Sequence, residues 1–270
     1  MRLIETVKSK DGTSIAFERR GHGPPLVMVH GTTLDHTRWG TIVTKLAEHF
    51  SLYMVDRRGR GKSGDGPVYA IEREFEDVAA VLDATSEPAR ILAHSYGAIC
   101  SLEASRLTAR VAKMVLYEPP LPLPGRGPIF ASDLAQRLEA LLAAGNREAV
   151  VEGFLREVIR LGDSDIERLR RSSSWPVRVQ AAPTIPREVG IANTYRFAAE
   201  TFAHVRVPTL FLVGSISPDY MHAATKMASA AVAGSRIENL RGQGHAAMST
   251  APGIFVEKVL AFLEDRPGEG

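Results

Sequence analysis

The sequence predicts an α/β protein with a mostly parallel central sheet, helices on both faces and an inserted helical segment. Short apolar runs alternate with stretches whose apolar residues recur at helical spacing, which is typical of strand–helix–strand units. The alternation stops after Pro119 and resumes only after Ala203, and between them the chain shows helical patterns without a convincing strand.

The first half begins with a predicted hairpin, because an Asp-Gly turn at Asp11 and Gly12 separates two strand-like segments. Two continuous apolar runs then indicate strands that are covered on both faces. Helical spacing of apolar residues follows each run. The predicted strands are 3–7, 15–18, 25–30 and 52–55, and the predicted helices cover 39–50 and 71–82.

The second half continues the alternation on both sides of the helical interval. Helix-like segments follow each of the last two strands. The predicted strands are 89–93, 111–117, 209–213 and 235–240, with a helix over 97–104. We therefore predict a core formed by 1–120 and 204–270, with 121–203 as a helical cap over the strand ends.

Composition sets limits on function. The chain has 270 residues, 44% of them hydrophobic, and its net charge of +2 comes from interspersed basic and acidic residues. That balance gives no sign of a nucleic-acid or anionic membrane partner. One cysteine, Cys100, excludes an internal disulfide and suits a reducing compartment. Without a signal-peptide pattern or a membrane span, we expect a cytoplasmic protein with a small-molecule substrate; the oligomeric state stays open.

Ser95 is the most informative residue. It lies in AHSYG, residues 93–97, between a predicted strand and a predicted helix. This segment is a near match to the G-x-S-x-G nucleophile elbow, in which a strained turn exposes the serine hydroxyl. Ala93 replaces the first glycine of that pattern. The alternative interpretation is an ordinary turn in which Ser95 caps the helix.

Four motifs in order give a resemblance to a known family. They are HGTT at 30–33, DRRGRGKS at 56–63, AHSYG at 93–97 and GQGHA at 242–246. Along essentially its whole length the chain resembles the α/β-hydrolase superfamily, and it looks most like the bacterial serine hydrolases with a helical cap. The resemblance implies the α/β-hydrolase fold.

The resemblance also implies roles for single residues. Ser95 corresponds to the nucleophile, and His245 is the candidate base that takes its proton. The backbone N–H groups of Thr32 and Tyr96 fit the oxyanion hole. His30 and His94 lie within the motifs and are given supporting roles.

Two residues compete for the third catalytic position. The family usually has its acid in the loop after the strand before the last one, where the usual position holds Ser217 and Asp219 follows. Asp219 also fits the start of the next helix. Glu118 ends a central strand, where the imidazolium of His245 offers it a partner. We favour Glu118 by a narrow margin.

No cofactor or metal is expected. Residues 59–64 satisfy G-x-G-x-x-G after a strand, but a dinucleotide site needs a helix that begins at those glycines. Here Asp65, Gly66 and Pro67 intervene, and the next helix begins near Ile71. We find no cluster of His, Cys, Asp and Glu with convincing metal-ligand spacing.

These observations predict a serine hydrolase that cleaves a small ester, thioester, lactone or related acyl compound through an acyl-enzyme. A carbon–carbon bond hydrolase or a cofactor-free perhydrolase is the first alternative. A ligand-binding or signalling protein that retains the fold with little turnover is the second. Five aromatic residues of the helical interval offer an apolar roof or ordinary packing: Phe130, Phe154, Trp175, Tyr195 and Phe197.

Overall fold

The central sheet of the computed structural model, which describes residues 3–264, has eight strands in the order β1-β2-β4-β3-β5-β6-β7-β8. The first two strands join the sheet antiparallel, and the strands from β4 to β8 are parallel. This confirms the predicted fold class. The strands are β1 (Leu3–Lys8), β2 (Ser14–Arg20), β3 (Pro25–Val29), β4 (Ser51–Val55), β5 (Ala89–His94), β6 (Val111–Tyr117), β7 (Thr209–Gly214) and β8 (Arg236–Leu240).

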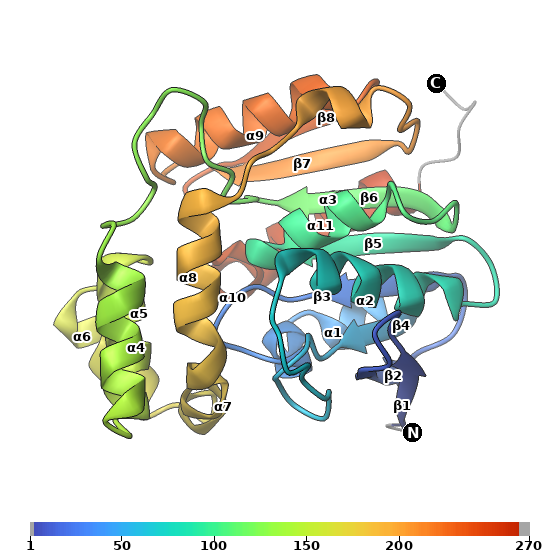
Figure 1. Ribbon diagram of the computed structural model, residues 1–270. Helices are drawn as coiled ribbons and strands as arrows, with labels where there is room; N and C mark the ends of the chain where they lie inside the picture. Colours follow the sequence, from blue (N-terminus) through green and yellow to red (C-terminus); the bar gives the residue numbers. More distant parts are fainter. Residues whose placement is uncertain (1–2, 265–270) are drawn as a thin grey trace.

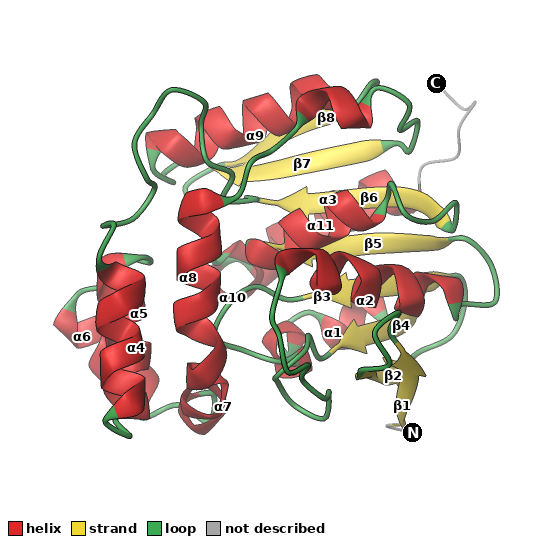
Figure 2. Ribbon diagram, viewed as in Figure 1, coloured by secondary structure: helices red, strands yellow, loops and turns green. Residues whose placement is uncertain are grey.

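Helices cover both faces of the sheet, as Figures 1 and 2 show. Within β3, Val27 and Val29 face one core while Leu26 and Met28 face the other, which is the two-residue period of a strand buried on both sides. The first core is covered by α2 (Ile71–Asp83), α3 (Tyr96–Ala104) and α9 (Asp219–Ala231). The second is covered by α1 (Val43–Leu46), α10 (Ala247–Thr250) and α11 (Pro252–Glu264).

Five helices lie between β6 and β7 in the chain. They share an apolar core of their own, which includes Leu138, Phe154 and Ile185. Figure 1 shows them together at one end of the sheet, with α8 beside it. They are α4 (Leu134–Ala143), α5 (Arg147–Glu157), α6 (Asp163–Arg170), α7 (Trp175–Ala181) and α8 (Ile185–Thr194). The division into core and cap stays a prediction, and its positions 1–2 and 265–270 lie outside the described residues.

The helix predicted over 39–50 is wrong in its length. The structure has instead a 3₁₀ turn η1 (His36–Trp39), which ends at Gly40, and the short helix α1. Glycine and the β-branched residues that follow it have low helix propensity, so the apolar spacing alone does not sustain a helix. The apolar residues are nevertheless buried, because Trp39, Ile42 and Leu46 pack in the second core.

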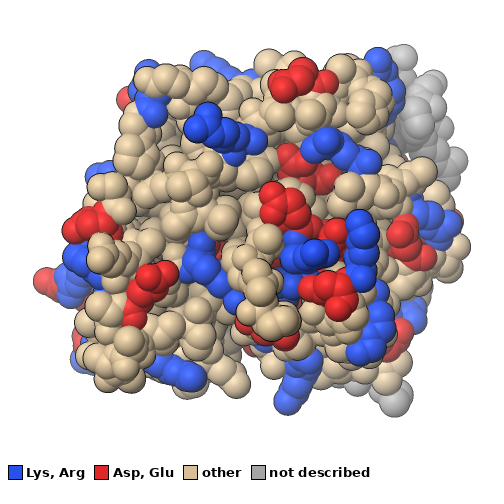
Figure 3. Space-filling model, in the orientation of Figure 1, with Lys and Arg blue, Asp and Glu red and all other residues tan. Residues whose placement is uncertain are grey.

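The surface carries both signs of charge. On the face in Figure 3, lysine and arginine side chains alternate with aspartate and glutamate. Across residues 3–264, no helix combines the length and the apolar character that crossing a bilayer requires.

Candidate active site

Ser95 lies in the turn between β5 and α3, with a backbone φ of 55° and ψ of −127°. Non-glycine residues rarely adopt a positive φ, so the surrounding contacts must hold this turn. A Cβ at Gly97 would lie 2.3 Å from the backbone oxygen of His30, so a glycine is required there. The Ser95 side chain makes no capping hydrogen bond to α3, so the alternative interpretation of Ser95 as a side-chain N-cap does not hold.

His245 lies in the loop after β8, and its Nδ1 is 2.5 Å from Oε2 of Glu118. Glu118 directly follows β6, is fully buried and has a positive φ of 49°. Strand β6 is hydrogen-bonded to β5, and the Ser95 N–H donates to the Tyr117 carbonyl at 2.8 Å. Neighbouring strands therefore hold Ser95 and Glu118 at the same edge of the sheet.

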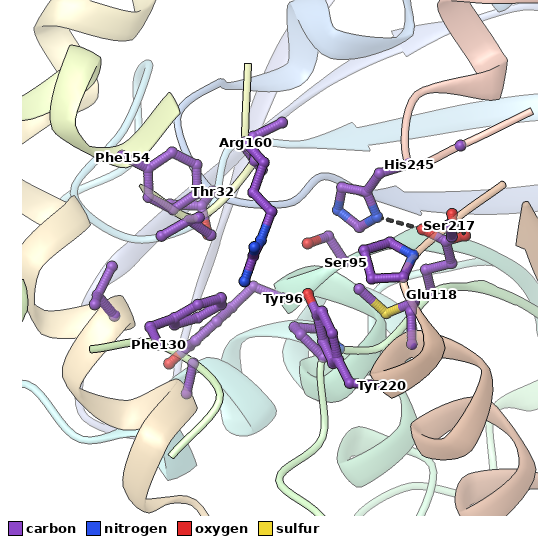
Figure 4. A pocket seen from close by; sticks show the side chains of 18 of the residues that line it. Thr32, Ser95, Tyr96, Glu118, Phe130, Phe154, Arg160, Ser217, Tyr220 and His245 are labelled. Carbon is purple, nitrogen blue, oxygen red and sulfur yellow. Dashed lines mark hydrogen bonds and ion pairs between the residues drawn. The ribbon is translucent and has the colours of Figure 1, made fainter. Parts of the chain in front are cut away.

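The second carboxylate oxygen of Glu118 accepts two further hydrogen bonds. The Ser217 hydroxyl donates to Oε1 at 2.5 Å, and the Gly214 N–H donates to it at 2.7 Å. Burial raises the pKa of Glu118, but the hydrogen bonds from His245, Ser217 and Gly214 lower it by more, so the net pKa is below 4.5. Glu118 is thus held as a carboxylate against His245 (Figure 4).

Asp219 is the first residue of α9 and is exposed. The structure brings Ser217 to the Glu118 carboxylate and leaves Asp219 at the start of the helix, where a negative charge interacts well with the helix dipole.

Two residues fix the loop that carries His245. His94 Nε2–H donates to the His245 carbonyl at 2.8 Å, and the Tyr117 hydroxyl donates to the Gly244 carbonyl. Burial and the nearby His245 lower the pKa of His94 well below 6.5, which keeps its ring neutral. Sequence reasoning missed Tyr117, because nothing distinguishes it from the apolar residues of its strand.

The predicted oxyanion loop is held by His30. Its Nδ1–H donates to the Gly31 carbonyl at 2.7 Å, and its Nε2 accepts from the Arg57 N–H at 3.3 Å. Burial, followed by the charge of Arg57, lowers the pKa of His30 well below 6.5. Thr32 borders the same cavity as Ser95 and Tyr96, and Tyr96 begins α3, where a backbone N–H has no acceptor within the helix.

A buried arginine–glutamate cluster adjoins this loop, since the Arg57 N–H donates to His30. The cluster consists of Arg57, Arg60, Glu74 and Glu188. Arg57 binds Glu74 through Nε and Glu188 through Nη2, each at 2.7 Å, and Arg60 also binds Glu188. Because Glu188 belongs to α8 and the other three to the sheet side, the cluster connects the inserted helices to the core. Sequence reasoning placed Arg57 and Arg60 in a family motif but missed both glutamates, which lie far away in the chain.

Two cavities meet at Ser95. The first has a volume of about 270 Å³ and is lined by Glu118, Phe130, Phe154, Arg160 and Tyr220 among others; Figure 4 shows Arg160 reaching into it. The second, of about 680 Å³, extends past Thr33, Arg38 and Arg178. The two cavities share five lining residues, Thr32, Ser95, Phe154, Ile159 and His245.

Of the five aromatic residues considered for an apolar roof, Phe130 and Phe154 line the first cavity. The other three have packing roles. Trp175 is buried in the core of the inserted helices, while Tyr195 and Phe197 pack against the first core of the sheet.

One group within residues 3–264 has the spacing of metal ligands, namely Asp35, His36 and Asp56. Its atoms are already engaged. Asp35 Oδ1 accepts from the backbone and hydroxyl of Thr37, and Asp56 accepts from His36 Nδ1 at 2.7 Å and from the Lys62 N–H at 2.9 Å. We therefore assign this group a role in fixing loops.

The chain matches a known protein family over most of its length. Residues 26–258 match the profile of the family described as the alpha/beta hydrolase family. The chain belongs to the alpha/beta hydrolase family. It is therefore a hydrolase enzyme, and the resemblance inferred from its four motifs is confirmed.

Among solved structures, an alpha/beta hydrolase from Sphaerobacter thermophilus DSM 20745 is 33% identical, with a TM-score of 0.84 over 96% of this chain and 100% of that one. The esterase RhEst1 from Rhodococcus sp. ECU1013 is 26% identical, with a TM-score of 0.75 over 97% and 98%. A pimeloyl-[acyl-carrier protein] methyl ester esterase from Aeromonas hydrophila is 25% identical over 260 residues, which are 93% of this chain and 99% of that protein.

Other curated relatives are matched over a smaller part of their length. The chain spans 18% of the probable oxidoreductase EphD of Mycobacterium tuberculosis, through 104 residues that are 37% identical. These residues are 36% of this chain, so the similarity covers only a segment.

Proposed function

We propose that this hydrolase cleaves a small ester, thioester, lactone or related acyl compound through an acyl-enzyme on Ser95. The observation that carries the proposal is the contact of His245 Nδ1 with the buried Glu118 carboxylate, beside a cavity that Ser95 also lines. A serine, an imidazole and a buried carboxylate are the groups that nucleophilic acyl transfer requires.

In this mechanism the Ser95 hydroxyl attacks the acyl carbon while its proton passes to Nε2 of His245. Glu118 holds the ring through Nδ1 and stabilises the imidazolium that forms. The N–H groups of Tyr96 and Thr32 donate to the developing oxyanion. His245 then protonates the leaving group. Water attacks the acyl-enzyme while its proton passes to Nε2 of His245, and the ring gives that proton to the Ser95 oxygen as the bond to the acyl group breaks.

The comparisons support an ester substrate class at a coarse level. The similar proteins include one named as an esterase and one named as a methyl ester esterase. We extend only that class, the hydrolysis of a small ester or related acyl compound, to this chain.

A fluorophosphonate probe tests the proposal, because it labels a serine only when a base activates that serine. We expect stoichiometric labelling of Ser95 in the wild type and none in Ser95→Ala or His245→Ala. Hydrolysis of p-nitrophenyl acetate is followed in parallel. Folded wild-type protein that neither takes the label nor turns over the ester would contradict the proposal and favour a ligand-binding role.

A further inference from the structure

Two arginines line the second cavity without an acidic partner among residues 3–264. Arg38 lies in η1 and Arg178 in α7, and both border the same cavity as Ser95 and His245. Both residues are half-buried. One comes from the segment after β3, on the sheet side, and the other comes from the inserted helices.

The contacts of both guanidinium groups are to neutral atoms. Arg38 donates to the Ser249 hydroxyl at 3.0 Å and to the Met248 sulfur at 2.8 Å. Arg178 donates to the Thr33 hydroxyl at 2.6 Å, while its Nε is buried and finds no acceptor in the part of the chain that the structure describes. Within the described part of the chain, neither arginine forms an ion pair, whereas Arg57, Arg58 and Arg60 all do.

Such a pair of unneutralised charges is unfavourable in the free protein. Burial lowers the pKa of Arg38 to about 10, with a further contribution from the charge of Arg178, and burial lowers the pKa of Arg178 to about 10 as well. A partly desolvated cation gains free energy when an anion reaches it. The two arginines also repel each other, so one anion that binds both relieves two costs.

The remaining charged groups of the cavity leave this excess of positive charge in place. Asp165 lines the same cavity, but it binds Arg168 at 2.6 Å. His94 and His245 border it too, and His94 is held neutral. Glu118 lines the first cavity and is not among the residues that line the second.

We propose that the substrate carries a carboxylate, which binds in the second cavity to Arg38 and Arg178. This inference rests on the proposed function and adds the substrate class. A guanidinium group presents its N–H donors in a planar fork that matches a carboxylate. Arg178 contacts Thr33, which directly follows Thr32, and Arg38 contacts Met248 of α10, the helix that begins two residues after His245. An anion bound to both arginines is thereby held close to the residues that surround Ser95, where it positions the scissile bond.

Two pairs of esters test the proposal, since the carboxylate can belong to the acyl group or to the leaving group. The first pair is p-nitrophenyl hydrogen glutarate and p-nitrophenyl methyl glutarate. The second is m-(carboxymethyl)phenyl acetate and its methyl ester. In at least one pair we expect kcat/KM to be about 10- to 100-fold higher for the carboxylate, as for a charge-assisted hydrogen bond gained in the transition state.

The variants Arg38→Met and Arg178→Met are each expected to reduce that ratio to about one. Arg168→Met is the matched control. It also removes a positive charge from this cavity, but Asp165 already neutralises that charge, so the ratio of this variant should equal that of the wild type. Arg160→Met tests the arginine of the first cavity. A wild-type ratio near one in both pairs overturns the proposal, as does a ratio that survives either Arg38→Met or Arg178→Met or that depends on Arg160.

A binding measurement separates this proposal from the proposed function. Glutarate is expected to raise the melting temperature of the wild type, while the neutral analogue glutaramide and the two arginine variants give no shift. If no ester is hydrolysed but this pattern holds, the anion site stands and the hydrolytic function fails. If esters are hydrolysed without the pattern or the ratio, only the anion site fails. Arg38→Gln and Arg178→Gln replace the methionine variants if those do not fold.

Discussion

At the scale of single residues, Glu118 is the part of the candidate site that departs from the usual acidic position of the family. It lies at the end of β6, while the usual acidic position of the family is occupied by Ser217. The structure brings both side chains to one point, because the Ser217 hydroxyl donates to the same carboxylate that holds His245. Sequence reasoning favoured Glu118 over Asp219 by only a narrow margin, since only spatial contact distinguishes a carboxylate beside His245 from one that begins a helix.

We predict that Glu118→Gln lowers kcat on p-nitrophenyl acetate by roughly 10²- to 10⁴-fold, because the amide no longer stabilises the imidazolium of His245. Asp219→Asn is the matched control, and its kcat should stay within about twofold of the wild type, since surface substitutions rarely have larger effects. Full activity in Glu118→Gln together with loss in Asp219→Asn would reverse the assignment.

Glu118 should also contribute to stability in a pH-dependent way. Its folded pKa is below the ordinary value of 4.5, so its contribution is fully present above pH 4.5 and is lost as the pH falls through the folded pKa. Urea unfolding of the wild type and of Glu118→Gln at pH 7, 5, 4 and 3 measures this contribution to the free energy of unfolding, since these values lie on both sides of the ordinary glutamate pKa of 4.5. We expect the advantage of the wild type to shrink only in the acidic range, and an advantage that stays the same from neutral to acidic pH would contradict this pH dependence.

At the scale of elements, the turn between β5 and α3 depends on close backbone approach. The pattern of small residues around Ser95 predicted this turn, and Ala93 shows that one of the two small positions tolerates a methyl group. The second small position, Gly97, has no room for a methyl group, because an added Cβ would lie 2.3 Å from the His30 backbone oxygen and 2.6 Å from the Val29 backbone oxygen.

Gly97→Ala is therefore expected to destabilise the protein by about 1–3 kcal/mol or more, as overpacked sites do. Alanine favours a helix over glycine by up to about 1 kcal/mol, which is too little to offset the clash. Gly127→Ala is the control, since no atom of the described residues lies within 4 Å of its added Cβ. Chemical denaturation gives both values, and equal stability of Gly97→Ala and wild type would contradict the close approach.

The elements that alternate regularly could be predicted from the sequence, because a buried strand and an amphipathic helix each leave a clear period. The segment 39–50 could not. Its apolar residues have helical spacing and are buried, but Gly40, Thr41 and Ile42 lie between η1 and α1 and divide the segment. Burial fixed the spacing there, and backbone propensity fixed the conformation.

At the scale of the whole molecule, the arginine–glutamate cluster joins the inserted helices to the sheet. Glu188 of α8 binds two arginines of the loop after β4, and all three side chains are buried. Arg57 also lies over the ring of Tyr96, with its guanidinium carbon 4.6 Å from the centroid. The cluster thereby sets the position of α8 relative to the turn that holds Ser95.

We predict that Glu188→Gln costs about 3–5 kcal/mol of unfolding free energy, because it leaves two buried arginines without their shared partner. Glu157→Gln, which removes an exposed ion pair with Arg137, is the control and should change the urea midpoint very little. A midpoint for Glu188→Gln close to that of Glu157→Gln would show that the cluster is not needed for stability.

The overall architecture could be predicted from motifs and periodicity, but the two cavities could not. Their walls combine residues from the sheet edge with residues from α5 to α8, and sequence patterns do not say how an inserted segment lies over a sheet. The charge pair Arg38 and Arg178 is of this kind. Each is one arginine among many in the sequence, and only the fold brings both to one cavity.

The carboxylate of Glu118 joins three parts of the chain that lie far apart in the sequence. Ser217 is 99 residues away and His245 is 127 residues away, yet both contact this one side chain. A single carboxylate thus links the end of β6 to the loop after β7 and to the loop after β8, so a displacement of either loop would change the position of the His245 ring.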